Sequence, residues 1–186
     1  MFQTIWGDRD RFVKTYFERY CKDPKSKRWQ DWPYLTGDAA VVAQDGYVRI
    51  LGRIDDVINV SGHRLGTKEI ESAALTHPDV AEAAVVPVKH EIKGLEPDLY
   101  VALKPGKKAS EEVAKAISQC VVKEIGAIAR PRKVWIVPDM PKTRSGKIMR
   151  RVLGAISNHA EVGDVMTLAN PEIVEAILKM NKEAGV

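Results

Sequence analysis

A basic loop toward the C-terminal end of the chain carries residue types that neutralise phosphate. Residues 141–148 read Pro-Lys-Thr-Arg-Ser-Gly-Lys-Ile and combine hydroxyl groups, a glycine and three cations beside a helix start. Such a loop can close on an anion, and Lys147 would then act as a point charge. The loop is not a P-loop, because the spacing Gly-x-x-x-x-Gly-Lys-Ser/Thr is absent. The alternative is an exposed basic loop without a ligand.

Two earlier segments carry groups suited to a nucleotide. Asp38 ends the run Tyr-Leu-Thr-Gly-Asp, and an ionised carboxylate is well matched to the two hydroxyls of a ribose. Residues 52–66 combine three glycines with Arg53 and Arg64, so backbone freedom and phosphate-compatible charge occur together. A simple capped turn is the alternative for the first segment, and a solvated connector with ordinary ion pairs is the alternative for the second.

The elements that must position these residues follow from hydrophobic patterning. Asp45-Gly46 between two β-prone runs predicts a β-hairpin over Ala39–Leu51. Apolar stripes predict a helix capped by Thr67 that ends before Pro78, a helix from Ser110 to Gly126, and helices around residues 152–156 and 173–178. Strands are predicted over Val80–Val88, Leu99–Leu103 and Lys133–Val137, with a charged, solvent-facing loop over Lys89–Asp98.

This order predicts an α+β fold: a small mixed or antiparallel β-sheet flanked by helices and preceded by a β-hairpin. Residues 2–31 crowd many aromatic side chains among charged ones and are too few to bury them. This stretch is therefore predicted to be cut from, or docked on, a larger body, and we expect an incomplete remnant of a larger N-terminal domain here.

Composition restricts the class of protein. Among 186 residues, 45% are hydrophobic and the net charge is only +4, which is not the dense basic patch of a nucleic-acid binder. The two cysteines, Cys21 and Cys120, have no metal-type spacing and fit a reducing cytoplasm. No apolar run is long enough for a membrane span. We therefore expect no nucleic acid and no membrane among the partners.

Taken together, these segments resemble the AMP-forming acetyl-CoA synthetases of the acyl-adenylate-forming superfamily. The resemblance runs from Thr-Ile-Trp-Gly-Asp at residues 4–8, through Arg53–Glu71 and Pro141–Arg151, to Leu-Ala-Asn-Pro at residues 168–171. It implies a two-step ligase: acetate and ATP give acetyl-adenylate and pyrophosphate, and the coenzyme A thiol then gives acetyl-CoA and AMP. It also implies that residues 1–54 end a large N-terminal adenylation domain and that residues 55–186 form a mobile C-terminal domain.

The resemblance assigns roles to particular residues. It implies that Lys147 bridges the carboxylate and the α-phosphate during adenylation, where a cation is most effective. Asp38 and Arg53 would hold the ribose of ATP or AMP, and Arg64 would reach the phosphates. Asp55 would be the hinge about which the domain swings between the two half-reactions.

Further roles concern coenzyme A, a metal and regulation. Ser61 and Gly62 would line the coenzyme A channel, and Leu75, His77 and Val80 match a segment where family members hold a metal, here Mg²⁺, through backbone oxygens. Many members have a phosphate-binding arginine where this chain has Val122, and the adjacent Lys123 projects in another direction. The family also implies acetylation of Lys147 by a protein acetyltransferase and its reversal by a sirtuin-type deacetylase, with loss of the charge.

The phosphate loop and the acyl pocket of the family are missing from this chain. We therefore expect the isolated chain to be inactive without the N-terminal domain. The alternatives are a ligase fragment for propionate or another short acid, a truncated product with a regulatory role such as a decoy for the acetyltransferase, and a non-enzymatic basic binding module. The last would bind in a strongly salt-dependent way and would be indifferent to changes at Asp38 or Lys147.

Overall fold

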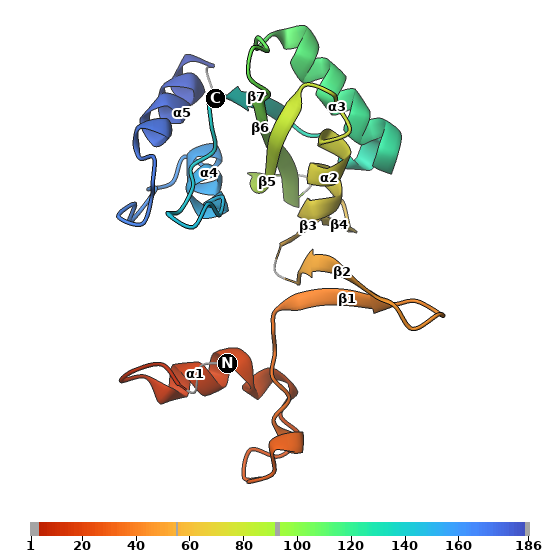
Figure 1. Cartoon of the computed structure of the whole chain (residues 1–186), viewed down its shortest axis with the longest axis vertical. Coiled ribbons are helices and arrows are strands. Elements are labelled where there is room, and N and C mark those ends of the chain that lie inside the picture. The colour runs from red at the N-terminus through yellow and green to blue at the C-terminus, as the bar shows by residue number, and fades with distance from the viewer. Residues whose placement is uncertain (1–3, 55, 92–93, 185–186) are drawn as a thin grey trace. The chain divides into compact units, whose positions relative to one another are not determined.

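The structure, a computed structural model, consists of two compact units, residues 1–55 and 56–186. The structure describes residues 4–54, 56–91 and 94–184 (Figure 1). Asp55, the predicted hinge, therefore lies outside the described residues.

The first unit consists of short helical segments followed by a β-ribbon. Its helix α1 (Arg9–Tyr16) begins where the Asp8 carboxylate accepts a hydrogen bond from the Arg11 N–H at 3.0 Å. Two single 3₁₀ turns follow, η1 (Glu18–Tyr20) and η2 (Trp29–Asp31). The ribbon pairs β1 (Asp38–Val42) with β2 (Val48–Arg53) in antiparallel order. This confirms the predicted hairpin.

Aromatic side chains in the first unit are buried only in part. The rings of Tyr16 and Tyr34 stack at a centroid distance of 5.5 Å, and Phe12 contacts Tyr16 and is buried. Trp6, in contrast, is 98% exposed. On the ribbon, apolar side chains from both strands also remain exposed, among them Val42, Tyr47, Val48 and Ile50. Much of the apolar surface of this unit therefore has no partner within the described part of the chain.

The second unit is built on a five-stranded mixed sheet. Its strands are β3 (Val57–Val60), β4 (His63–Gly66), β5 (Val80–His90), β6 (Gly94–Leu103) and β7 (Lys133–Val137). The order is β4-β3-β6-β5 with antiparallel pairing, and β7 pairs with β6 in parallel. The predicted α+β class is confirmed.

Helices cover both faces of this sheet (Figure 1). On one face, α2 (Thr67–Ala74) and α3 (Glu111–Ile125) pack with Val85 and Leu99 in one core, which extends to the 3₁₀ turn η3 (Ala127–Ala129). On the other face, α4 (Arg150–Ser157) and α5 (Glu172–Glu183) pack with Val86 and Tyr100 in a second core. Successive residues of β5 and β6 therefore point to opposite cores, as the period of a strand requires.

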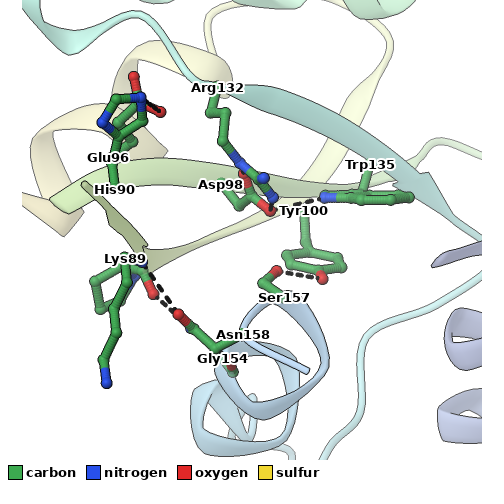
Figure 2. Close-up of polar contacts among 11 residues, drawn as sticks. Lys89, His90, Glu96, Asp98, Tyr100, Arg132, Trp135, Gly154, Ser157 and Asn158 are labelled. Carbon is green, nitrogen blue, oxygen red and sulfur yellow. Dashed lines mark hydrogen bonds and ion pairs between the residues drawn. The ribbon is translucent and has the colours of Figure 1, made fainter. Parts of the chain in front are cut away.

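Strand β5 lies at one end of the strand order, and side chains bond several of its backbone groups. The Val85 N–H donates to Glu71 Oε1 at 3.0 Å. Asn158 accepts from the Lys89 N–H at 3.1 Å and donates to the Pro87 carbonyl at 2.9 Å (Figure 2). Pro87 itself has no N–H to satisfy. Side chains of α2 and α4 thus hold β5 in place.

The predicted loop over Lys89–Asp98 is wrong, because β5 and β6 continue through most of it and pair from His90↔Gly94 onward. Asp98 is fully buried rather than exposed. Its carboxylate accepts two hydrogen bonds of 2.8 Å from Arg132 and one of 3.0 Å from the Trp135 indole (Figure 2). These partners lie more than thirty positions away, so the charge that suggested a loop is compensated inside the fold.

One helix start was predicted correctly and another was not. Ser110 is the N-cap of α3, and its hydroxyl accepts from the Val113 N–H at 3.3 Å. The N-cap of α2 is Gly66, whereas Thr67 is the first helical residue and its side chain is buried.

No helix among the described residues is long and apolar enough to cross a bilayer.

Candidate functional site

The ribbon of the first unit brings Asp38 and Arg53 together. The two residues face each other in register at the open end of β1 and β2. Arg53 Nη1 lies 3.8 Å from Asp38 Oδ1 and donates to the Thr36 carbonyl at 3.0 Å. Both side chains are about half exposed, at 44% for Asp38 and 48% for Arg53. The carboxylate therefore retains acceptor capacity toward solvent, as ribose hydroxyls would require.

Gly37 makes room for this arginine. It has φ +80°, and a Cβ at this position would lie 2.5 Å from Arg53 Nη2. The turn before Asp38 therefore needs glycine both for its backbone and for the guanidinium. A pocket of about 360 Å³ adjoins the turn, lined by Thr15, Tyr16, Arg19, Leu35, Thr36, Gly37, Arg53 and Ile54. Arg19 has no predicted role, because no local sequence pattern links it to this turn.

Ser61 and Gly62 form the two-residue turn between β3 and β4. Their φ angles are +49° and +84°, and Val60 pairs with His63 across them. Positive φ at both central residues is typical of a type I′ hairpin turn, which accounts for glycine at this position. A Cβ on Gly62 would meet no atom within 4 Å. The turn therefore presents an unobstructed edge.

A basic pocket adjoins this turn. It has a volume of about 340 Å³ and is lined by Val60, Ser61, Glu96, Pro97, Ala127, Ile128, Arg130, Pro131 and Arg132. Arg130 is exposed, whereas Arg132 is held by Asp98. Arg64 lies on β4 opposite Asn59 and is exposed. Arg64 belongs to the second unit, whereas Asp38 and Arg53 belong to the first.

Lys147 ends a tight turn. The Thr143 N–H donates to the Lys147 carbonyl at 2.8 Å, and the Gly146 N–H donates to the Thr143 carbonyl at 2.8 Å. The Lys147 N–H donates to the Thr143 hydroxyl at 3.1 Å, and Gly146 has φ +79°. The side chain of Lys147 is exposed, and within the described residues no ion pair engages its ammonium. A backbone fixed by three hydrogen bonds thus presents a cation to solvent.

Lys142, at the base of the same loop, has a different role. Its Nζ donates to Glu82 Oε1 at 2.8 Å and to Asp139 Oδ1 at 3.0 Å. These hydrogen bonds to the carboxylates of Glu82 and Asp139 raise the pKa of Lys142 above its usual value. Burial acts to raise the pKa of Asp139, but hydrogen bonds from Lys142 and the Met140 N–H outweigh it and hold that pKa below its usual value. Lys142 therefore anchors the loop.

These ion pairs make the stability of the loop depend on pH. A carboxylate with a lowered pKa stabilises the fold above its unfolded pKa, and this stabilisation is lost as pH falls through the folded value. The Lys142 contribution is present below its unfolded pKa and is lost as pH rises through the folded one. We therefore expect the hydrogen-exchange protection factors of residues 142–148, which correct for the intrinsic pH dependence of amide exchange, to fall below about pH 4. Asp139→Asn should weaken protection at neutral pH and flatten its acid dependence; an unchanged profile would contradict this role of Asp139.

The predicted metal segment forms the end of α2 and the turn into β5. The His77 N–H donates to the Ala74 carbonyl at 3.2 Å, and the His77 carbonyl accepts from the Val80 N–H at 3.1 Å. The imidazole accepts from the Asp79 N–H at 3.2 Å, and Leu75 is about half exposed. No group of three or more acidic, His or Cys side chains that could hold a metal occurs in the described residues. A cation here would therefore depend on carbonyl oxygens, which keep a second lone pair after one hydrogen bond.

Comparisons with known proteins give a consistent picture. Residues 69–147 match the AMP-binding enzyme C-terminal domain. The chain is 47% identical over 180 residues to an acetyl-coenzyme A synthetase of Alcanivorax borkumensis, covering 95% of this chain and 26% of the relative. It is 48% identical over 184 residues to an acetyl-coenzyme A synthetase of Gemmatimonas aurantiaca, covering 99% and 27%. The chain thus spans about a quarter of the length of the curated relatives it matches.

Solved structures agree with the sequence relatives. The ATP-bound RpMatB-BxBclM chimera B1 is similar with a TM-score of 0.68 and 30% identity, covering 82% of this chain and 28% of that one. The anthranilate CoA ligase AuaEII in complex with anthranoyl-AMP is similar with a TM-score of 0.63 and 33% identity, covering 72% and 26%. As with the sequence relatives, the similarity involves about a quarter of each longer chain.

Proposed function

We propose that this chain forms the C-terminal part of an AMP-forming acetate–CoA ligase, because residues 69–147 match the AMP-binding enzyme C-terminal domain. Acetate and ATP would form acetyl-adenylate and pyrophosphate, and coenzyme A would then release AMP as acetyl-CoA forms. The observation that carries the proposal is the exposed Lys147 on its rigid turn. Near-half identity with acetyl-coenzyme A synthetases along almost the whole chain supports it.

Lys147 would act in the first step. As the acetate oxygen attacks the α-phosphorus of ATP, negative charge builds on the phosphate oxygens and pyrophosphate leaves. A positioned ammonium stabilises that charge more than it stabilises the separated reactants. Asp38 would accept hydrogen bonds from the ribose hydroxyls with Arg53 beside it, and Arg64 would reach the phosphates.

Ser61 and Gly62 would act in the second step, after rotation about Asp55. The turn has open space at Gly62, so a thin pantetheine arm can pass. The pocket beside Ser61 presents Arg130 and Arg132, and guanidinium groups suit the phosphates of coenzyme A. Arg130, which is exposed, would supply the positive charge that Val122 does not, since Arg132 is paired with Asp98. The division of the chain between residues 55 and 56 is compatible with a hinge at that point.

The remaining roles concern the metal and the partners. Backbone oxygens of Leu75, His77 and Val80 would hold Mg²⁺, a hard cation that takes oxygen ligands, and the metal would neutralise phosphate charge. We propose that an N-terminal domain supplies the phosphate loop and the acyl pocket, so the choice of acid is made outside this chain. An acetyltransferase and a sirtuin-type deacetylase would act on the exposed Lys147 in the cytoplasm.

Domain replacement tests the proposal. We expect the 186-residue chain alone to make no acetyl-CoA. In a chimera, the chain would replace the aligned quarter of one of the acetyl-coenzyme A synthetases. We expect this chimera to catalyse both acetate-dependent ATP–pyrophosphate exchange and thioester formation, with the relative lacking that quarter as the inactive control. A well-folded chimera that catalyses neither reaction would contradict the proposal.

Substitution of Gly62 tests the coenzyme A passage separately. Gly62→Asn keeps a residue that tolerates positive φ but places a side chain at the open edge of the turn. We expect thioester formation in the chimera to fall by about 10- to 100-fold through steric obstruction, while ATP–pyrophosphate exchange is retained. Gly106→Asn, at another glycine with positive φ (+81°) and no atom within 4 Å of the added Cβ, is the matched control. Equal loss of both half-reactions in Gly62→Asn would argue against the passage.

A further inference from the structure

Asn170 fastens the loop that carries Lys147. Its Oδ1 accepts from the Lys142 N–H at 3.0 Å, and its Nδ2 donates to the Met140 carbonyl at 2.9 Å. The same amide nitrogen lies 3.4 Å from Asp139 Oδ2. One side chain therefore bonds the backbone on both sides of Pro141, where the loop begins.

The residues before Asn170 extend this attachment. The Ala169 N–H donates to the Lys142 carbonyl at 2.8 Å, and Thr143 and Leu168 form an antiparallel bridge. The opposite side of the loop is closed by a bridge between Lys142 and Ile148. Residues 168–170 thus act as a third strand along the loop.

Asn170 also connects the loop to the rigid part of the unit. Its carbonyl accepts from the Ile173 N–H at 3.2 Å in the first turn of α5. Val174 and Ile177 of that helix are buried in the core beneath α4 and α5. Leu168, on the other side of Asn170, is buried in the same core. The side chain is therefore fixed at both ends by packed residues, so the contacts are preorganised.

From these contacts we infer that Asn170 is a positioning residue for Lys147 in the adenylation step. The inference rests on the proposed function. Lysine has a flexible stem, so the placement of its ammonium depends on the backbone from which it starts. A displacement of about 1 Å between a catalytic group and the reacting atoms can lower the rate on the order of 100-fold. Asparagine suits this position because it supplies an acceptor to Lys142 and donors to Met140 at once.

The first test compares two asparagines in the chimera. Asn170→Ala is expected to lower the rate of ATP–pyrophosphate exchange at saturating substrates by about 10- to 100-fold. Thioester formation from supplied acetyl-adenylate should be retained, because it does not use Lys147. Asn158→Ala is the matched control, since its side chain likewise accepts from one backbone N–H and donates to backbone carbonyls, but at the opposite end of α4. It should slow neither half-reaction by more than about 2-fold after correction for the folded fraction.

A second measurement follows the loop without catalysis. In the 186-residue chain, Asn170→Ala is expected to increase hydrogen exchange at the amides of Thr143, Gly146 and Lys147 by at least about 10-fold. The same amides should be unaffected in Asn158→Ala. Asn170→Asp keeps the acceptor for Lys142 but loses the donor to Met140 and faces Asp139, so an intermediate effect is expected.

The outcomes separate this inference from the proposed function. If Lys147→Ala slows exchange in the chimera and Asn170→Ala does not, the positioning role is wrong while the function stands. If Lys147→Ala has no effect, the catalytic assignment itself fails. A loss of both half-reactions in Asn170→Ala, equal to that in Asn158→Ala, would mean that Asn170 is only structural.

Discussion

Lys147→Ala in the complete ligase is expected to slow adenylate formation by about 100- to 1,000-fold. Its ammonium is exposed and, within the described residues, has no ion pair that would retain it. The whole charge is therefore available to the forming acyl-phosphate bond. Thioester formation from supplied acetyl-adenylate should be almost unchanged, because in the proposed second step the departing group would be AMP and the domain would have rotated. ATP–pyrophosphate exchange and thioester formation, measured separately, check this prediction.

Two variants of the same loop serve as controls. Arg144→Ala removes one exposed positive charge from the same turn and should slow adenylation by less than about 3-fold. Lys147→Gln removes the charge but keeps a long polar side chain, and it should be nearly as slow as the alanine variant. Similar rates for Arg144→Ala and Lys147→Ala would mean that the loop contributes only its overall charge.

The largest expected loss of stability is at Glu71. This carboxylate is 4% exposed and joins α2 to both β5 and α4. Arg150 donates three hydrogen bonds of 2.8–3.0 Å to it, and Lys68 and the Val85 N–H donate one each at 3.0 Å. Alanine would leave the Arg150 charge and the Val85 N–H without their acceptor. Removing one partner of such a buried pair costs about 3–5 kcal/mol.

Urea denaturation of the 186-residue chain measures this loss. Glu71→Ala should lower the unfolding midpoint with little change in the slope, whereas Glu71→Gln should lower it less because the amide still accepts one hydrogen bond. Glu69→Ala is the control on the same helix, since Glu69 is exposed, and should change stability by less than about 0.5 kcal/mol. A loss below about 1 kcal/mol for Glu71→Ala would show that this ion-pair network is dispensable.

Elements with strong local signals were predicted correctly. Ser110 and Gly126 bound α3, Asp45-Gly46 lies in the turn of the ribbon, and Lys133–Val137 is a strand. Each depends on contacts within a few residues: a cap, a turn conformation or an apolar alternation. Such information is contained in a short window of sequence.

The missed elements depend on contacts between distant residues. No hairpin was predicted over β3 and β4, because Ser61 with positive φ is unusual for a non-glycine residue and gives no turn signal as strong as Asn-Gly. The paired residues 94–98 include Pro97 and Asp98, which are unfavourable in strands. Asp98 is tolerated there because Arg132, just before β7, and Trp135, on β7, donate hydrogen bonds to its carboxylate. No sequence pattern near Asp98 identifies Arg132 or Trp135 as its partners.

The candidate site shows the same difference between local sequence signals and contacts of distant residues. The sequence indicated Lys147, Asp38, Arg53 and the Ser61-Gly62 pair, and the structure places Asp38 beside Arg53 and puts Lys147 at the end of a tight turn. The residues that fix the loop were missed, because Glu82 is sixty positions and Asn170 twenty-eight positions from Lys142. Motifs thus named the candidate groups, whereas the contacts that support them required the fold.

The side-chain bonds along β5 affect how this domain behaves in concentrated solution. A strand at the end of a sheet usually offers a row of free amides to which a strand from another molecule can add, the first step of fibrous aggregation. Here Glu71 accepts a hydrogen bond from the Val85 N–H, and Asn158 accepts one from the Lys89 N–H and donates one to the Pro87 carbonyl. Pro87, between these two donors, has no N–H. Residues 85–89 of this sheet edge are therefore closed to intermolecular β-addition, which disfavours attachment of one molecule to another.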